Sequence, residues 1–496
     1  MAKNSNTIRL IFGFKVKYLR QQKGLSYQQL STLTGLSLSY IHDIEKGKKY
    51  PKTDKIMALA EALEVDYDYM VSLRASKKLQ PIIDILHSDL LKDYPLEVFG
   101  LSPSKLLELF SNIPEKINAF ISTILTITRS YQMTREHFYQ AALRSYQDMH
   151  DNYFEDIERV VKLFKEENQV GKVYAFRPKA LEKLLKDNYE ITVDRDYLNK
   201  NPKLQKVRSY YKKKKKILYL NSNLSNAQET FLLGRELGFQ YLNLKERSCE
   251  TRIINVKSFD KLLNNFKASY FSAALLMDEQ LLIADFKQIA QLSTWQEDAF
   301  LELLDKYNIT AEMLVQRLTN ILPKHFGIKN LFFLRISGSS DLQQFNMTKE
   351  LHLAQQQHHP YSNERKEHYC QRWIAINIIK RLRAMPNSGQ QIIADAQVSK
   401  YWGTRNAYLC LTLAKRSNQN PTENISVTIG LLVNSTLKQT VKFLDDPNLK
   451  QKDVNITCER CDMPNCGARV APPVMVEAQQ EQDAVQEALA DLEQEK

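Results

Sequence analysis

Residues 25–63 read LSYQQLSTLTGLSLSYIHDIEKGKKYPKTDKIMALAEAL and predict three short helices separated by tight turns. Ser26 and Ser37 are placed to cap the first two helices, because a serine hydroxyl at a helix start accepts a hydrogen bond from a backbone N–H of the first turn. Gly35 lies between these helices, where a tight turn requires a residue that tolerates positive φ. The stretch therefore predicts an all-helical domain.

Apolar residues within this stretch recur at helical spacing and predict the core of the domain. Leu30 and Leu33 are expected on the inner face of the first helix, and Leu36 in the angle between the first two helices. The other predicted core residues are Ile41, Ile44, Ile56, Leu59, Ala60 and Leu63. Gly47 is expected to end the second helix, and Pro51 blocks its continuation.

Residues 8–73 as a whole resemble the phage-repressor-like helix-turn-helix family of the Cro and C1 type. The resemblance rests on the turn glycine, the helix caps, the apolar spacing and the exit sequence E-K-G-K-K-x-P. Tyr27 departs from the family, which usually has a glutamine in contact with the backbone at this place. The resemblance implies a DNA-binding domain. The alternative is a helical domain of this shape that serves only protein contacts.

The second helix of a helix-turn-helix lies in the major groove and presents its first turn and one further face to base edges. The residues predicted to meet base edges are Leu38, Ser39, Tyr40 and Asp43, with His42 nearby. The lysines predicted to neutralise phosphates are Lys46, Lys48, Lys49 and Lys52. The net charge of +12 agrees with a polyanionic partner, and double-stranded DNA is the expected one.

A second motif lies in FLLGRELGFQYL, residues 231–242. The helix of a zinc peptidase carries His-Glu-x-x-His, with two imidazoles one turn apart and the glutamate as general base. Only Glu236 matches this pattern, because Arg235 and Phe239 stand in the histidine positions. Glu236 is therefore expected to be structural, paired with Arg235 or another neighbour.

The stretch NNFKASYFSAALLMDEQLL, residues 264–282, resembles the helix that supplies the third ligand in the anti-repressor zinc peptidases. Asn265 or Lys267 stands at the ligand position, depending on the alignment, and neither offers a suitable donor for zinc at neutral pH. We therefore expect a degenerate peptidase domain and no enzyme. One alternative is an unrelated amphipathic helix. Another is a peptidase that cleaves a repressor, but the loss of both histidines argues against it.

Three of the six cysteines fall within T-C-E-R-C-D-M-P-N-C-G-A-R-V-A-P-P, residues 457–473. The spacing Cys458-x-x-Cys461-x4-Cys466 lets three thiolates converge, because a two-residue gap folds into a tight turn. Clustered cysteines in a chain with so few of them point to a metal or a cluster more often than to a disulfide. The alternatives are a [4Fe–4S] cluster with a fourth ligand elsewhere, a zinc ion with a distant fourth donor, or no metal.

The order of these motifs resembles the short-chain fatty acyl transcriptional regulator family. That family also carries a Cys-Pro-x-Trp element upstream, and residues 370–373, Cys-Gln-Arg-Trp, resemble it with glutamine in place of proline. The resemblance implies a regulator whose C-terminal region senses a coenzyme A thioester, with an iron–sulfur cluster in the cysteine motif. The cluster ligands that it implies are Cys458, Cys461 and Cys466, with Cys370 as the fourth ligand or a near neighbour.

The predicted chain is multidomain. Its parts are an all-α helix-turn-helix domain at 7–74, a helical linker or dimerisation region at 75–172, an α+β degenerate zinc-peptidase-like domain at 173–322, an α+β sensor domain at 323–473 and an acidic tail at 474–496, a frayed helix or disordered. Strands are predicted at 191–198, 215–225, 330–337, 407–414 and 425–434, and a helix from about 226. A homodimer is expected, because two such domains must sit roughly 34 Å apart on DNA.

The apolar segments favour a cytoplasmic protein without a membrane anchor. The longest nearly uncharged stretch, 117–128, is too short to span a bilayer, and the N-terminal residues show no secretory pattern. A rival to the sensor hypothesis is an antitoxin-like interaction protein that binds DNA only to repress its own promoter. The roughly 420 residues beyond the first domain argue against it, since such a protein needs far less chain.

Overall fold

The computed structural model describes most of the chain. The described residues are 2–72, 135–171, 173–248, 258–339, 341–342, 344–353, 367–386, 392–416 and 424–494. They belong to two compact units, the first formed by residues 1–146 and 255–262 and the second by residues 147–254 and 263–496. Most of the helical region predicted at 75–172, and with it most of the predicted dimer element, lies outside the described residues.

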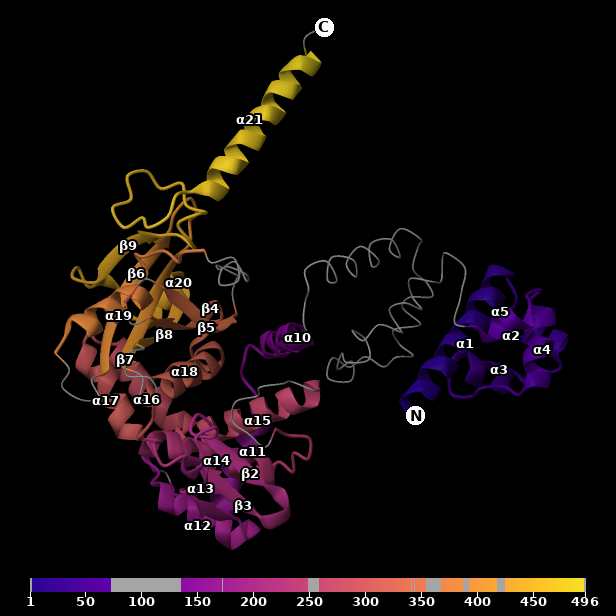
Figure 1. Cartoon of the computed structure of the whole chain (residues 1–496), viewed down its shortest axis with the longest axis horizontal. Helices are drawn as coiled ribbons and strands as arrows, with labels where there is room; N and C mark the ends of the chain where they lie inside the picture. The colour runs from indigo at the N-terminus through magenta and orange to yellow at the C-terminus, as the bar shows by residue number, and fades with distance from the viewer. Residues whose placement is uncertain are drawn as a thin grey trace. The chain divides into compact units, whose positions relative to one another are not determined.

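The first unit begins with five helices, drawn in indigo in Figure 1. They are α1 (Ala2–Gln22), α2 (Tyr27–Thr34), α3 (Leu38–Glu45), α4 (Thr53–Ala62) and α5 (Tyr67–Val71). The predicted caps are confirmed, since the Ser26 hydroxyl accepts from the Gln29 N–H and the Ser37 hydroxyl from the Tyr40 N–H. Gly35 has φ of +66°, which confirms its place in the turn.

The core of this domain contains the predicted residues of α3 and α4 and the Leu63 cap that follows, together with Phe12, Val16 and Leu19 of α1. Leu30 is fully buried, but the prediction for Leu33 is wrong, because 59% of its surface is exposed. Leu33 lies three residues after Leu30 and so is rotated by about 60° around the helix. The narrow buried stripe of this eight-residue helix does not reach that far.

The region after residue 150 contains a small sheet, with helices before it and after it along the chain. The helix α10 (Arg135–Met149) precedes this region, whose own helices are α11 (Glu155–Glu167), α12 (Pro178–Tyr189), α13 (Tyr197–Lys200), α14 (Asn226–Tyr241), α15 (Phe259–Leu276), α16 (Glu279–Ala290), α17 (Glu297–Tyr307) and α18 (Ala311–Phe326). The strands β1 (Thr192–Asp194), β2 (Ser209–Lys212) and β3 (Ile217–Leu220) form a sheet of order β1-β3-β2, with β1 parallel and β2 antiparallel to β3. The strands predicted at 191–198 and 215–225 are thus confirmed over shorter spans.

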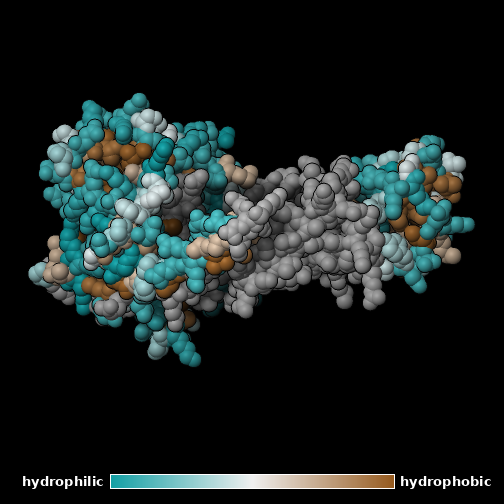
Figure 2. Space-filling model, turned by 90° about the horizontal axis from the view of Figure 1, so that it is seen from above, coloured by the Kyte–Doolittle hydropathy of each residue, from teal (hydrophilic) through white to brown (hydrophobic). Residues whose placement is uncertain are grey.

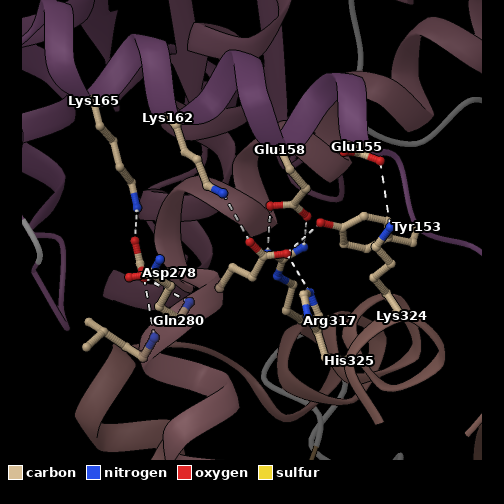
Figure 3. A network of polar contacts seen from close by, with 12 residues as sticks. Tyr153, Glu155, Glu158, Lys162, Lys165, Asp278, Gln280, Arg317, Lys324 and His325 are labelled. Carbon is tan, nitrogen blue, oxygen red and sulfur yellow. Dashed lines mark hydrogen bonds and ion pairs between the residues drawn. The ribbon is translucent and has the colours of Figure 1, made fainter. Parts of the chain in front are cut away.

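Helices α11, α16 and α18 are joined by a network of buried charges (Figure 3). Arg317 of α18 is fully buried and donates to both carboxylate oxygens of Glu158 at 2.5 and 3.0 Å. Glu279 at the start of α16 accepts from the Tyr153 hydroxyl at 2.7 Å and lies 2.8 Å from His325 Nε2. These contacts therefore link α11, α16 and α18 to one another.

Two glycines allow α14 to approach α15 closely. A Cβ on Gly234 would lie 2.6 Å from the Ser272 hydroxyl, and one on Gly238 would lie 3.1 Å from the Ala268 carbonyl oxygen. Only glycine leaves room for this contact. The two motif helices recognised in the sequence are thereby brought side by side.

The C-terminal region contains a six-stranded sheet of order β5-β4-β8-β7-β6-β9 (Figure 1). The strands are β4 (Leu331–Gly338), β5 (Phe345–His352), β6 (Ile392–Tyr401), β7 (Ala407–Arg416), β8 (Asn424–Leu432) and β9 (Lys450–Val454), and the helical elements are α19 (Ile374–Ala384), α20 (Ser435–Thr440) and η3 (Lys442–Asp445). All neighbours are antiparallel except β6 and β9. Ile376 and Ile379 of α19 pack with Phe332 and Tyr408 of the sheet.

The chain ends in α21 (Val474–Gln494), so within the described residues the acidic tail is a helix rather than disordered. Nearly all of its side chains are exposed. None of the helices in the described part of the chain is long and apolar enough to span a membrane.

Candidate functional site

The nine predicted DNA-contacting residues lie together on α3 and on the loop between α3 and α4. Leu38, Ser39 and His42 are exposed, as are the four lysines, whereas Tyr40 and Asp43 are half-buried. Figure 2 shows hydrophobic side chains among polar ones at the surface of this domain, at the right of the view. Leu38, 42% exposed at the start of α3, is placed to make apolar contact outside the domain.

The orientation of α3 is fixed from inside by a buried ion pair. Arg20 of α1 donates from Nε and Nη2 to the two carboxylate oxygens of Glu45, at 2.6 and 3.0 Å. The Tyr27 hydroxyl donates to the same carboxylate at 2.7 Å, and its ring lies 4.0 Å from the Arg20 guanidinium. Burial and the neighbouring carboxylate raise the pKa of Tyr27 to about 12. Tyr27, which departs from the family pattern, therefore binds two side chains and links α2 to α1 and α3.

The outer face of α3 carries its own charge contacts. Asp43 forms an ion pair with Lys49 at 3.1 Å, and this partner lowers the pKa of the Asp43 carboxyl. The Nζ atoms of Lys49 and Lys55 lie 5.5 and 4.8 Å from the Tyr40 ring centre, within range of a cation–π contact. Lys55 of α4 was not among the predicted contacts. Its only signal in the sequence is its place one turn into the helix that follows the lysine-rich loop.

The motif helix α14 carries Arg235, Glu236 and Phe239, the residues of the expected degenerate peptidase motif. Glu236 is buried, and both of its carboxylate oxygens accept hydrogen bonds from Arg247, the first at 2.8 Å. Gln240 donates to the same carboxylate at 2.7 Å. The partner of Glu236 is therefore Arg247, a residue eleven positions downstream, and not Arg235.

The three positions that correspond to the ligands of a zinc peptidase carry side chains that are not zinc ligands. Arg235 Nη2 donates to Asn265 Oδ1 on α15, so of the two candidates Asn265 is the residue that faces α14. The Arg247 guanidinium lies 3.8 Å from the Phe239 ring centre and 4.7 Å from that of Tyr211. Two guanidinium groups, an amide and aromatic rings thus occupy the site.

Four cysteines from two distant segments line one pocket in the C-terminal region. They are Cys370, Cys458, Cys461 and Cys466. A short antiparallel contact between Tyr369 and Thr457 brings the segments together. The Cys370 N–H donates to the Ile456 carbonyl at 3.0 Å, and the Cys458 N–H to the His368 carbonyl at 2.9 Å. The expected convergence of Cys370 with the cysteine motif is therefore present in the structure.

Charged side chains hold the cysteine loop in shape. Arg469 donates to three loop carbonyls, those of Cys458 at 3.1 Å, Cys461 at 3.0 Å and Met463 at 2.9 Å. The Glu459 carboxylate accepts from the backbone N–H of His368 and lies 2.7 Å from its Nδ1. The loop is thus held both by its own arginine and by the segment that carries Cys370.

The thiols of this pocket act on one another. Burial raises the pKa of the Cys370 thiol, the nearby Cys458 and Cys461 thiols raise it further, and the Asn455 N–H, 3.4 Å from the sulfur, lowers it. No three His, Cys, Asp or Glu side chains among the described residues are grouped so that they could hold a metal ion. The fit to a metal centre therefore rests on the donor set, four thiols on one pocket, and not on a closed coordination geometry. Cys410 lies elsewhere, in β7.

Residues 16–70 match the family described as "Helix-turn-helix", and residues 197–319 match the family described as "IrrE N-terminal-like domain". The control protein C.BamHI of Bacillus amyloliquefaciens is 39% identical over 62 residues, which cover 12% of this chain and 76% of the control protein. This chain belongs to the helix-turn-helix family. The HTH-type transcriptional repressor RghR of Bacillus subtilis is 41% identical over 58 residues, 12% of this chain and 43% of the repressor, so this helix-turn-helix protein matches less than half of that relative.

A solved structure of a Mycobacterium tuberculosis transcriptional regulator resembles this helix-turn-helix protein with a TM-score of 0.47. The two are 16% identical, and the match covers 66% of this chain and 92% of the other. The two family matches and the strands of the chain itself give the architecture: a helical helix-turn-helix region, an IrrE-like domain, and a mixed helix and sheet remainder.

The sequence reasoning missed the residues that support each site. The supporting residues are Arg20 and Glu45 behind α3, Lys55 beside Tyr40, Arg247 opposite Glu236, and Glu459 and Arg469 around the cysteines. Arg469 did stand in the quoted cysteine motif, but its role as donor to three carbonyls carries no signal in the spacing. Charged residues that act on a site from a separate element are recognisable only once the chain is folded.

Proposed function

We propose that this helix-turn-helix protein is a sequence-specific, DNA-binding transcriptional regulator that acts as a homodimer. The observation that carries the proposal is the exposed first turn of α3, flanked by lysines and held from behind by the buried Arg20–Glu45 pair. A repressor and a control protein among its relatives support it. Leu38 and Ser39 meet base edges, and the lysines meet phosphates.

In vitro selection from a random duplex pool, with the full chain as bait, tests this proposal. A specific regulator enriches one motif, and a homodimer enriches it as an inverted or direct repeat with half-sites about one helical turn apart. Enrichment of no motif, with binding that depends only on salt, would contradict sequence-specific recognition. A single half-site bound by a monomer would contradict the homodimer alone.

The same proposal gives the cysteine pocket a sensory role. Cys458, Cys461, Cys466 and Cys370 would hold a [4Fe–4S] cluster, or a zinc ion as the alternative, because four thiols line one pocket. A bound cluster supplies redox sensitivity. The chain's part is to shield Cys370, Cys458 and Cys461 from solvent and to hold the loop in shape through Arg469.

Anaerobic purification, visible absorption and assays of iron, acid-labile sulfide and zinc test the metal. Iron and sulfide in the wild type, lost in a Cys461→Ser variant, would support the cluster. Stoichiometric zinc in a colourless protein would make the pocket a structural brace, and a metal-free protein that folds normally would overturn the proposal. A Cys410→Ser variant is the matched control, since Cys410 is buried in β7 outside this pocket.

The proposed signal is a short-chain acyl-coenzyme A thioester, which follows from the resemblance of the motif order. We propose no catalytic role for the IrrE-like domain, because Arg235, Phe239 and Asn265 stand where a peptidase needs metal donors. Titration of the full chain with propionyl-coenzyme A, followed by calorimetry and by affinity for the selected DNA motif, tests the signal. An unchanged DNA affinity at saturating thioester would contradict it.

A further inference from the structure

The pocket beside α14 holds more positive than negative charge. Arg247 is paired with Glu236 through two hydrogen bonds, so these two charges offset each other. Arg235, only 7% exposed, donates to the neutral amide of Asn265, and its Nε has no hydrogen-bond partner among the described residues. Within the described part of the chain, one buried guanidinium is therefore left without a carboxylate.

Such an arrangement is costly unless something compensates for it, because a buried charge requires a partner of opposite sign or a full set of hydrogen bonds. Burial and the like charge of Arg247 lower the pKa of Arg235 to about 10, and Glu236 opposes this shift. At neutral pH Arg235 is still charged. Among the described residues, Arg247 and Glu236 are the charged groups that shift the pKa of Arg235, and both line the same pocket.

The site has the shape of a small-ligand pocket. Arg235, Glu236 and Arg247 line it together with Ser209, Tyr211 and Ser248, and apolar residues complete the wall. The empty space of about 240 Å³ between these residues includes open solvent, and the cavity itself is about 10 Å³, room for about one water-sized group.

We propose that this pocket binds a small oxyanion, a carboxylate or a phosphate group, with Arg235 as its counter-charge. A guanidinium N–H pairs well with an oxygen of such a group, and Nε–H is the donor of Arg235 that lacks a partner among the described residues, since Nη2 donates to Asn265 Oδ1. In a zinc peptidase the same position attracts an oxygen ligand with a metal cation. Here a fixed guanidinium takes over the positive charge, so the degenerate site becomes a receptor for an anion. The proposal is independent of DNA binding and of the cysteine pocket.

The test uses the full chain with two probes, inorganic phosphate and benzoate, against sodium chloride at the same ionic strength. A ligand that binds only the folded protein raises the unfolding temperature in a saturable way, and calorimetry gives its affinity. Preference for benzoate assigns a carboxylate ligand, and preference for phosphate a phosphorylated one. If neither probe binds saturably, the proposal is overturned.

Variants separate this site from general anion binding. Arg235→Gln should weaken binding by on the order of thirtyfold or more, because the counter-charge is lost from a buried site. Arg195→Gln is the matched control, since Arg195 forms an ion pair with Glu182 and Glu229 at 2.6 Å in the same region, away from the pocket. Equal affinity in wild type and Arg235→Gln would overturn the proposal. If Arg235→Gln does not fold, Arg235→Lys, which keeps the charge but lacks the fork, replaces it.

A variant of opposite sign excludes a purely structural effect. Glu236→Gln leaves Arg247 without its carboxylate, and the second free positive charge should tighten binding on the order of tenfold. A damaged pocket would lose affinity instead. Weaker binding in a folded Glu236→Gln variant would therefore contradict the role assigned to the charge balance.

Discussion

The guanidinium of Arg20 and the carboxylate of Glu45 meet in two hydrogen bonds inside the helix-turn-helix domain, with the carboxylate side chain 1% exposed. This pair joins α1 to the last residue of α3. The Tyr27 hydroxyl adds a third contact from α2. The helix proposed to enter the major groove is therefore fixed from its inner side by charge, while its outer side carries the residues proposed to contact DNA.

Removal of one partner of this pair should destabilise the domain strongly. Glu45→Gln leaves Arg20 buried without a counter-charge, which costs about 3–5 kcal/mol in comparable pairs. The exposed pair between Lys23 and Glu64 offers the control, and Glu64→Gln should cost less than about 1 kcal/mol. Hydrogen exchange of the peptide covering α3, measured in the full chain, reports the effect. Equal protection in the two variants would contradict it.

The lysines after α3 should contribute affinity without sequence preference. Lys48→Ala should weaken binding to all sequences and reduce the magnitude of the slope of log K against log salt by about 0.9, as expected for one lost phosphate contact. Lys213→Ala, in the exposed turn between β2 and β3, is the matched control. Fluorescence anisotropy at several salt concentrations measures both. A slope that changes equally in the two variants would point to a nonspecific charge effect.

Lys15 should make stability of the helix-turn-helix domain depend on pH. Its Nζ donates to the Tyr69 and Ser72 carbonyls at 2.6 and 2.7 Å, and burial lowers its pKa to about 8 from 10.5. Between these values the unfolded chain binds more protons than the folded one, so the free energy of unfolding rises with pH from about 8 towards 10. Urea unfolding across this range should show the rise in the wild type and lose it in Lys15→Met. The same slope in both proteins would contradict it.

The sequence predicted this domain well because its signals are local. Caps, the turn glycine and apolar spacing act within a few residues, and Ser26, Ser37 and Gly35 were correct for that reason. Leu33 failed because a short helix buries a narrower stripe than its apolar residues suggest.

The sheet of the C-terminal region was predicted only in part. The central strands β4, β7 and β8 are apolar and were predicted, whereas the edge strands β5 and β9 are rich in exposed polar residues and were not. Edge strands carry fewer buried positions, so hydrophobic patterning gives them little signal. The buried strand β6 was also missed, because polar residues interrupt the apolar ones in its sequence IIADAQVSKY. Contacts such as that between Glu236 and Arg247 depend on tertiary packing and have no local signal.

Gly430 should tolerate no larger residue. A Cβ there would lie 2.1 Å from the Phe332 ring, its direct partner near one end of the β4–β8 pairing. Gly430→Ala should destabilise the sheet by about 1–3 kcal/mol or more through overpacking. Thermal unfolding measures the loss, and Phe332→Leu in the same chain should restore part of it. Gly403→Ala is no suitable control because of its positive φ, whereas Gly171→Ala meets nothing within 4 Å. A Gly430→Ala variant as stable as Gly171→Ala would contradict the close contact.

Arg469 should control how well the cysteine loop protects its thiols. Its guanidinium supports the carbonyls of Cys458, Cys461 and Met463, and each such charge-assisted hydrogen bond contributes about 1.5–3 kcal/mol. Arg469→Ala should therefore open the loop locally and speed labelling of Cys458 and Cys461 by a thiol reagent, without lowering the global unfolding temperature in proportion. Arg405→Ala removes an exposed arginine from the turn after β6 and serves as the control. Equal labelling rates in the two variants would show that the loop holds its shape without Arg469. Faster labelling in Arg469→Ala alone would identify this arginine as the link between the state of the thiols and the packing of the loop.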